Sequence, residues 1–187
     1  LLVVHAMRGC DSTSGIYGHG KVRVFKLITS NADTLPITDI ISMDEASQDI
    51  VVKAGLKLFA MIYRGKVTDN LNHMRYLSYM NLSAANKCRI RPESLPPTQN
   101  AARFHILRVH LQVIQWKTLK EVTNLLPEEW GWKVQDGRYE PVMTDQPAAA
   151  PDVLKVVRCG CKTTTRNTCG TNLCACHQHG LRCVPAC

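Results

Sequence analysis

HAMRGCDSTSGIYGHGKVRVFKLI, residues 5–28, joins an apolar opening segment to a basic segment through a turn rich in glycine. Gly18 and Gly20 flank His19, and Lys21 follows at once. Positions without a Cβ let backbone amides approach an anion closely, and the amino end of a helix adds about half a positive charge. The pattern favours a phosphate-binding turn, although glycines also open many helices for steric reasons alone.

A dinucleotide-binding turn is one alternative function for these glycines. That motif needs a third glycine three residues after the second one, so that helix and strand can pack closely. Position 23 is Arg, and the motif therefore fails.

The segments around the turn predict a mainly helical domain. Residues 1–7 form an apolar run that predicts a short buried strand, and residues 21–29 predict a helix. In residues 42–65, acidic and hydroxyl residues suited to helix capping precede apolar residues at helical spacing, so we expect a helix there. Its apolar positions are Ile50, Val51, Ala54, Leu58, Met61 and Ile62.

Prolines divide the rest of the domain. A polar loop with Pro36 is expected before the capped helix, and residues 69–80 predict a shorter helix. A long helix is expected over 98–126, after Pro92, Pro96 and Pro97. Its apolar seam is Ala101, Phe104, Leu107, Leu111, Ile114, Thr118, Val122 and Leu125.

Two features of this region have simple structural explanations. His105 and His110 are five residues apart, not the three or four that place two ligands on one helix face, so we expect core or surface histidines and no metal site.

Asp136-Gly137 predicts a tight hairpin, because both central residues of such a turn take positive φ. Trp130 and Trp132 are expected to pin this hairpin to the helices.

Length and charge set the broad organisation of the chain. The 187 residues suit one domain over 1–143, a proline-stiffened linker over 144–157 and a cysteine-rich module over 158–187. The net charge of +8 favours a polyanionic partner, nucleic acid above all, although a solvated basic surface explains it almost as well. No apolar run approaches the roughly 18 residues of a membrane span, so no membrane partner is expected.

The turn also resembles a known signature. GCD, then Gly18 and Gly20 seven and nine residues after Asp11, then basic residues, resembles the helix-two-turn-helix of the flap endonuclease and XPG-type nucleases. The resemblance implies that Asp11 ends a core strand as a divalent-metal ligand, for Mg²⁺, and that the turn grips the backbone of duplex DNA. The family usually has a proline where Lys21 stands. The implied backbone-gripping residues are Gly18, Gly20, Lys21, Arg23 and Lys26.

Catalysis would need more carboxylates than Asp11. Two metals about 4 Å apart require several acidic ligands, and that family supplies them upstream of the turn. Three interpretations therefore stay open. The remaining acids lie upstream of this chain, or the turn binds DNA without cutting it, or Asp11 only caps the following helix. The other acidic residues considered stand at a helix start or beside a proline turn, and they are Asp44, Glu45, Asp49, Glu128 and Glu129.

Seven of the nine cysteines fall in the last 29 residues, spaced C-x-C-x7-C-x4-C-x-C-x6-C-x3-C. Disulfides or zinc thiolates explain such regularity. Zinc is favoured because no secretion signal is visible, seven is odd, and C-x-C pairs suit one metal better than a mutual bridge. Two tetrahedral sites need eight ligands, and a shared cysteine, His177, His179 or a later cysteine could complete them. The expected ligands are Cys159, Cys161, Cys169, Cys174, Cys176, Cys183 and Cys187.

Two further resemblances concern the tail and the whole chain. The cysteine spacing resembles the CXC domain of tesmin/TSO1-type chromatin proteins, although the gap of seven is longer than usual there. HAMRGCDSTSGIYGHGK, LPPTQNAARFHILRVHLQVIQW, the Trp-rich hairpin and the CxC tail together resemble a group of invertebrate proteins that occur in many copies, as mobile-element-derived sequences do. This second resemblance implies little about function.

The sequence as a whole predicts nucleic-acid binding, as the DNA-gripping C-terminal part of a nuclease-like protein of mobile-element type. One alternative is a metal-dependent, structure-specific nuclease whose remaining acids lie upstream. The other is a scaffold that holds protein partners through its zinc module and has no salt-dependent affinity for DNA. An intracellular, nuclear location is expected.

Overall fold

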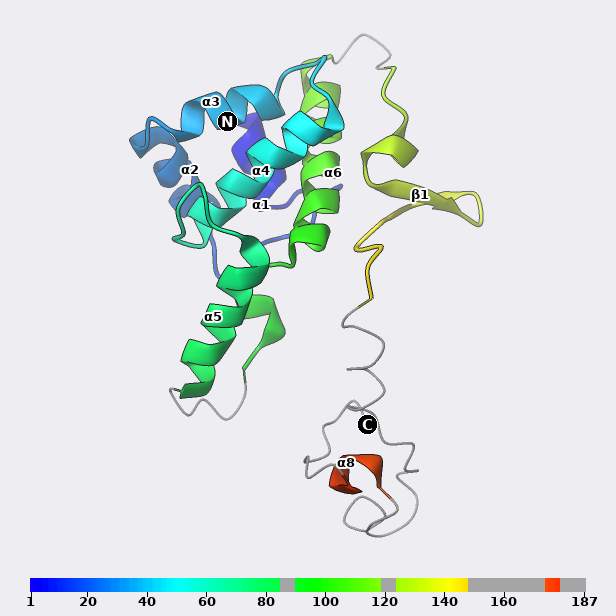
Figure 1. Ribbon diagram of the computed structural model, residues 1–187. Coiled ribbons are helices and arrows are strands. Elements are labelled where there is room, and N and C mark those ends of the chain that lie inside the picture. The colour runs from blue at the N-terminus through cyan, green and yellow to red at the C-terminus, as the bar shows by residue number, and fades with distance from the viewer. Residues whose placement is uncertain (85–89, 119–123, 148–173, 179–187) are drawn as a thin grey trace. The chain divides into compact units, whose positions relative to one another are not determined.

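The chain divides into two compact units, Leu1–Asp145 and Gln146–Cys187. The first unit is mainly helical and contains one two-stranded antiparallel hairpin, as the sequence predicted (Figure 1). The described part of the second unit contains one short helix. The computed structural model describes residues 1–84, 90–118, 124–147 and 174–178.

Helices make up most of the first unit, and the longest of those described has 19 residues. In the described ranges, no helix combines the length and the apolar character needed to cross a membrane. The elements are α1 (Leu2–Arg8), α2 (Lys21–Ser30), α3 (Thr34–Ile41), α4 (Gln48–Ile62), α5 (Leu71–Ala84), the 3₁₀ turn η1 (Pro92–Ser94), α6 (Gln99–Lys117), the 3₁₀ turn η2 (Pro127–Trp130), β1 (Trp132–Gln135), β2 (Arg138–Pro141) and, in the second unit, α8 (Ala175–Gln178).

Helix α6 is the centre of the core. Every residue from His105 to Leu111 is buried, so this stretch is covered on all sides and not along one stripe. Helices α1, α3 and α4 all pack on it, and Figure 1 shows α4 running beside it. A Cβ on Gly55 of α4 would lie 2.5 Å from Cγ1 of Ile106, so this glycine lets the two helices approach.

Polar side chains of α6 hold the surrounding elements in place. His105 donates from Nε2 to the carbonyl oxygen of Met7 (3.0 Å), and His110 donates from Nδ1 to that of Ile41 (2.9 Å). These carbonyls end α1 and α3, where no intrahelical partner exists. The prediction that both histidines are core or surface residues is confirmed, since both are buried.

The strand predicted for residues 1–7 is wrong, because this segment forms α1. Its buried residues include Val3, Val4 and Met7, and this spacing fits a helix face and not strand alternation. A short apolar run cannot be assigned by periodicity alone, and its valines favour a strand by propensity. Packing of the segment against α2 and α6 decides the outcome.

Two proline positions were also misjudged. The polar loop expected around Pro36 is helix α3, which tolerates proline in its first turn because that amide needs no partner. The long helix ends at Lys117 and does not reach 126. Leu126 precedes Pro127 and is extended, with φ −75° and ψ 124°, as proline requires of the preceding residue.

Other local predictions are confirmed. Helices form over 48–62 and 71–84, close to their expected positions. The hairpin turns at Asp136 (φ 50°) and Gly137 (φ 74°), and pairs Trp132 with Pro141. Trp130 is buried and stacks on His110 at 4.3 Å between ring centroids, which anchors the base of the hairpin to α6.

Candidate nucleic-acid interface

The segment between α1 and α2 contains two turns, at residues 11–12 and 17–18, so its order is helix, turn, turn, helix. Gly9 ends α1 with φ 113°. A Cβ at Gly9 would lie 2.7 Å from the Cα of Gly15, so the two ends of the first loop touch through backbone. This contact fixes the position of the second turn and of the start of α2 relative to α1.

The second turn leaves open space around its glycines. Gly18 has φ 73°, a conformation that favours glycine, and Gly20 is the residue before the first turn of α2. Apart from the adjacent residues, no heavy atom of the described residues lies within 4 Å of a Cβ built at Gly18 or Gly20. Both residues are exposed, so a ligand can approach this backbone from outside.

Three arginines surround His19, which lies between the two glycines. Burial, followed by the charges of Arg23, Arg8 and Arg64, lowers the pKa of His19 below its ordinary value of 6.5. None of the three arginines forms an ion pair with any residue that the structure describes. Nδ1 of His19 and Nε of Arg8 are buried without a hydrogen-bond partner. The turn is therefore a concentration of positive charge whose three arginines form no ion pair with a carboxylate in the described part of the chain.

The basic side chains of α2 face two different hollows. Arg23 and Lys26 join His19 and Arg64 around a hollow of about 190 Å³. Lys21 instead points toward α1, where its Nζ donates to Nδ1 of His5 at 2.9 Å. The structure thus brings Arg23 and Lys26 together beside the turn and places Lys21 on its other side.

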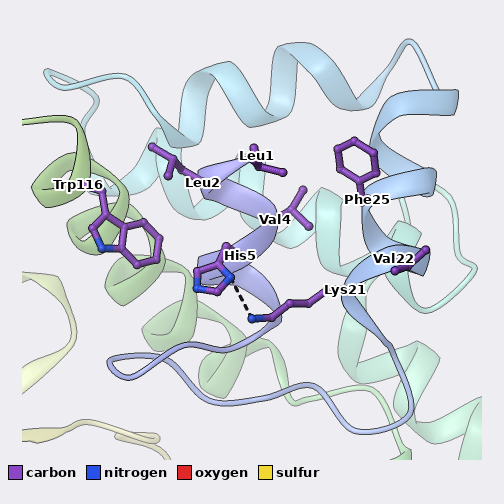
Figure 2. Close-up of a pocket in the computed structure, with 8 residues that line it drawn as sticks. All are labelled: Leu1, Leu2, Val4, His5, Lys21, Val22, Phe25 and Trp116. Carbon is purple, nitrogen blue, oxygen red and sulfur yellow. Dashed lines mark hydrogen bonds between the residues drawn. The ribbon is translucent and has the colours of Figure 1, made fainter.

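Figure 2 shows the setting of Lys21. Its ammonium reaches His5 beside an open groove of about 730 Å³ whose other lining residues are apolar, among them Val22, Phe25 and Trp116. The ammonium group has only donors, so Nδ1 of His5 accepts this hydrogen bond. Lys21 is therefore held at this edge of the turn by His5.

Asp11 lies in the first turn, exposed to solvent, and lines a hollow with Arg8, Lys21 and Gln112. It does not cap α2, because Gly20 occupies that position and no side chain bonds there. Among the described residues, no group of three or more histidine, cysteine, aspartate or glutamate side chains could hold a metal. Within the described ranges, Asp11 is therefore not joined by the carboxylates that a two-metal site needs.

Five of the seven expected zinc ligands lie outside the described residues. Cys174 is buried, and Cys176 belongs to the short helix α8. His177, one candidate for an eighth ligand, is exposed, and His179 lies beyond the described range. The ligands outside the described residues are Cys159, Cys161, Cys169, Cys183 and Cys187.

Sequence reasoning missed part of the basic cluster. His19 and Arg8 belong to the opening stretch, but nothing in that stretch indicates that Arg8 returns to His19 across the loop. Arg64 follows α4 and has φ 66°, which is unusual for a residue other than glycine. Its position beside His19 depends on the packing of α4, and no local pattern could have shown it.

Comparisons with known proteins add no relative. No protein-family model matches the chain, and no match was found among curated proteins or solved structures.

Proposed function

We propose that the unit Leu1–Asp145 binds the phosphate backbone of nucleic acid, duplex DNA in particular, through the turn between α1 and α2. The observation that carries this proposal is the cluster of Arg8, Arg23 and Arg64 around His19, with no carboxylate partner among the described residues. Phosphate oxygens would supply the missing negative charge and accept hydrogen bonds from the guanidinium groups.

The backbone of the turn supports the same proposal. Gly18 and Gly20 leave room for a phosphate near the first amides of α2, which have no intrahelical partner. Contacts of this kind position a duplex without reading its bases. We therefore propose binding that is sensitive to salt and indifferent to sequence, by a nuclear protein whose zinc module could add contacts of its own.

The nuclease alternative requires groups beyond those described. Asp11 is the one acid at the turn that the resemblance assigns to metal. Among the described residues, it belongs to no group of three or more metal-ligating side chains. Binding without cutting is the proposal that needs no additional residue. The scaffold alternative is tested by the same measurement as DNA binding, because it allows no salt-dependent affinity for duplex DNA.

Arg23→Ala and Arg64→Ala should each weaken binding to every duplex tested, by roughly tenfold at low salt, because each removes one charge-assisted bond to phosphate. The slope of log affinity against log salt should become shallower by about one for each variant. Fluorescence anisotropy with several unrelated labelled duplexes, over a salt series, gives both quantities.

Arg138→Ala is the matched control, since Arg138 is exposed on β2 and is not among the cations that act on His19. This variant should bind as the parent does. An effect of Arg23→Ala on one duplex and not on others would contradict backbone binding, and a parent chain without salt-dependent affinity would favour the scaffold.

Duplex affinity should rise as pH falls from about 7.5 to about 5.5, because a phosphate beside His19 stabilises its protonated form. Burial and the charge of Arg23 lower the pKa of His19 in the free protein, so a phosphate that raises this pKa makes the ring take up a proton on binding as pH falls. A rise of one unit in this pKa on binding corresponds to up to about tenfold in affinity at the acid end. His19→Gln should flatten the profile, and an unchanged profile in that variant would place the phosphate elsewhere.

A further inference from the structure

A second cavity, which we call the α6 cavity, lies behind the turn and has no part in the proposed DNA contact. It measures about 250 Å³. Its walls come from residues 14–17, from α4 and α5, from residues 92–97 and from the amino-terminal half of α6. Apolar side chains supply most of the lining, and they include Ile16, Phe59, Leu95 and Ala101.

Arg108 lines this cavity as a buried cation without a carboxylate. It is 2% exposed, and among the described residues it forms no ion pair. Its Nη1 donates to the carbonyl oxygens of Gly131 (3.1 Å) and Val142 (2.6 Å), and its Nε is buried without a partner. The guanidinium therefore has donor capacity left over in a place where an unpaired charge is costly.

His105 lines the same cavity one helical turn before Arg108. Burial lowers the pKa of His105 to about 4, so its ring is neutral at pH 7, and because Nε2 donates to Met7, Nδ1 carries the lone pair. Its edge meets the ring of Phe59 at 5.4 Å between centroids. The cavity thus combines one deeply buried cation, one neutral ring and apolar walls, the usual composition of a small-molecule site.

We propose that the α6 cavity binds a small carboxylate with an apolar body, its anionic end on Arg108 and its body against Phe59 and Leu95. A single charge fits better than a doubly charged phosphate, because Arg108 is the one deeply buried cation of the lining and Glu93 adds a negative charge at the rim. Arg75 also lines the cavity and bonds through Nη1 to the carbonyl oxygen of Pro96.

Titration calorimetry of the whole chain with benzoate, benzamide and inorganic phosphate tests the proposal. Benzoate should bind, and benzamide, which has the same shape without the charge, should bind at least about tenfold more weakly. Phosphate should not compete with benzoate, even where it competes with DNA at the turn. Equal affinity for benzoate and benzamide, or no benzoate binding at millimolar concentration, would overturn the proposal.

Variants locate the binding. Ala101→Leu fills the cavity from a half-buried helical position and should abolish benzoate binding while leaving the fold intact. Arg103→Met is the matched control, because Arg103 lies on the same helix and does not line the cavity. Arg75→Met should retain the preference for benzoate over benzamide. If Ala101→Leu still binds benzoate, the site is elsewhere, and if Arg75→Met loses the preference, Arg108 is not the anchor.

Discussion

Acidification from pH 6.5 to about pH 4 should remove about 3 kcal/mol from the free energy of unfolding of Leu1–Asp145, because His105 is buried as a neutral imidazole. Burial lowers the pKa of His105 from 6.5 to about 4, and the hydrogen bond to Met7 and the charge of Arg108 are smaller influences. The unfolded chain takes up this proton near pH 6.5 and the folded chain near pH 4. The stabilisation is therefore complete above pH 6.5 and is lost as pH falls through this range.

Urea unfolding of the whole chain, followed by tryptophan fluorescence, measures this effect, since all three tryptophans lie in the helical unit. His105→Gln keeps an N–H donor for Met7 but cannot titrate. Between pH 6.5 and about 4, its unfolding should therefore take up about one proton fewer than that of the parent, and its free energy of unfolding should change less with pH. His73→Gln, at an exposed position of α5, should keep the parent dependence. His110 also has a lowered pKa and adds to the loss with the same sign, so some dependence should remain in His105→Gln. A parent-like dependence in His105→Gln would show that His105 is not the group responsible.

The elements predicted correctly from sequence are those with a complete local signal. Helix α4 has an acidic residue in its first turn, Asp49, and a long apolar spacing, and the hairpin has Asp136-Gly137, where positive φ at both positions suits a tight turn. Helix α6 begins where Thr98 accepts a hydrogen bond from the amide of Ala101, a cap that follows directly from the sequence. In each case a few adjacent residues determine the structure, so tertiary packing has little to decide.

The errors lie where packing decides. α1 and α3 are short apolar segments, and in each of them a histidine of α6 bonds to a carbonyl of the last turn. That partner is about 98 residues away for Met7 and 69 for Ile41, so no local window contains it. The candidate site also combines local and long-range residues. Gly18, Gly20 and Arg23 are neighbours in sequence and could be predicted together. Arg64 reaches the turn only because of the position of α4.

Chelation of the whole chain at neutral pH should release about two Zn²⁺ and leave the helical unit folded, which is the largest effect we expect. Residues 158–187 hold seven cysteines but few large apolar side chains, so they cannot bury a core of their own. Zinc bound by thiolates would supply about 10–16 kcal/mol, and this binding free energy would be the folding free energy of the module. Native mass spectrometry gives the zinc count, and far-UV circular dichroism reports on the helical unit.

Cysteine variants separate zinc from its rival, a set of disulfides. Cys174→Ser and Cys176→Ser should each lower the zinc count, whereas Cys10→Ser and Cys88→Ser should not. Cys10 belongs to the helical unit, where its sulfur already lies 3.3 Å from Oγ of Ser12 and needs no metal. Zinc thiolate sites should survive dithiothreitol, because reductant does not remove a bound metal, and should lose their zinc in chelator. Disulfides would instead be reduced by dithiothreitol without chelator. A native mass that contains disulfides and no zinc would contradict the zinc prediction, and the resemblance to the CXC domain would fail with it.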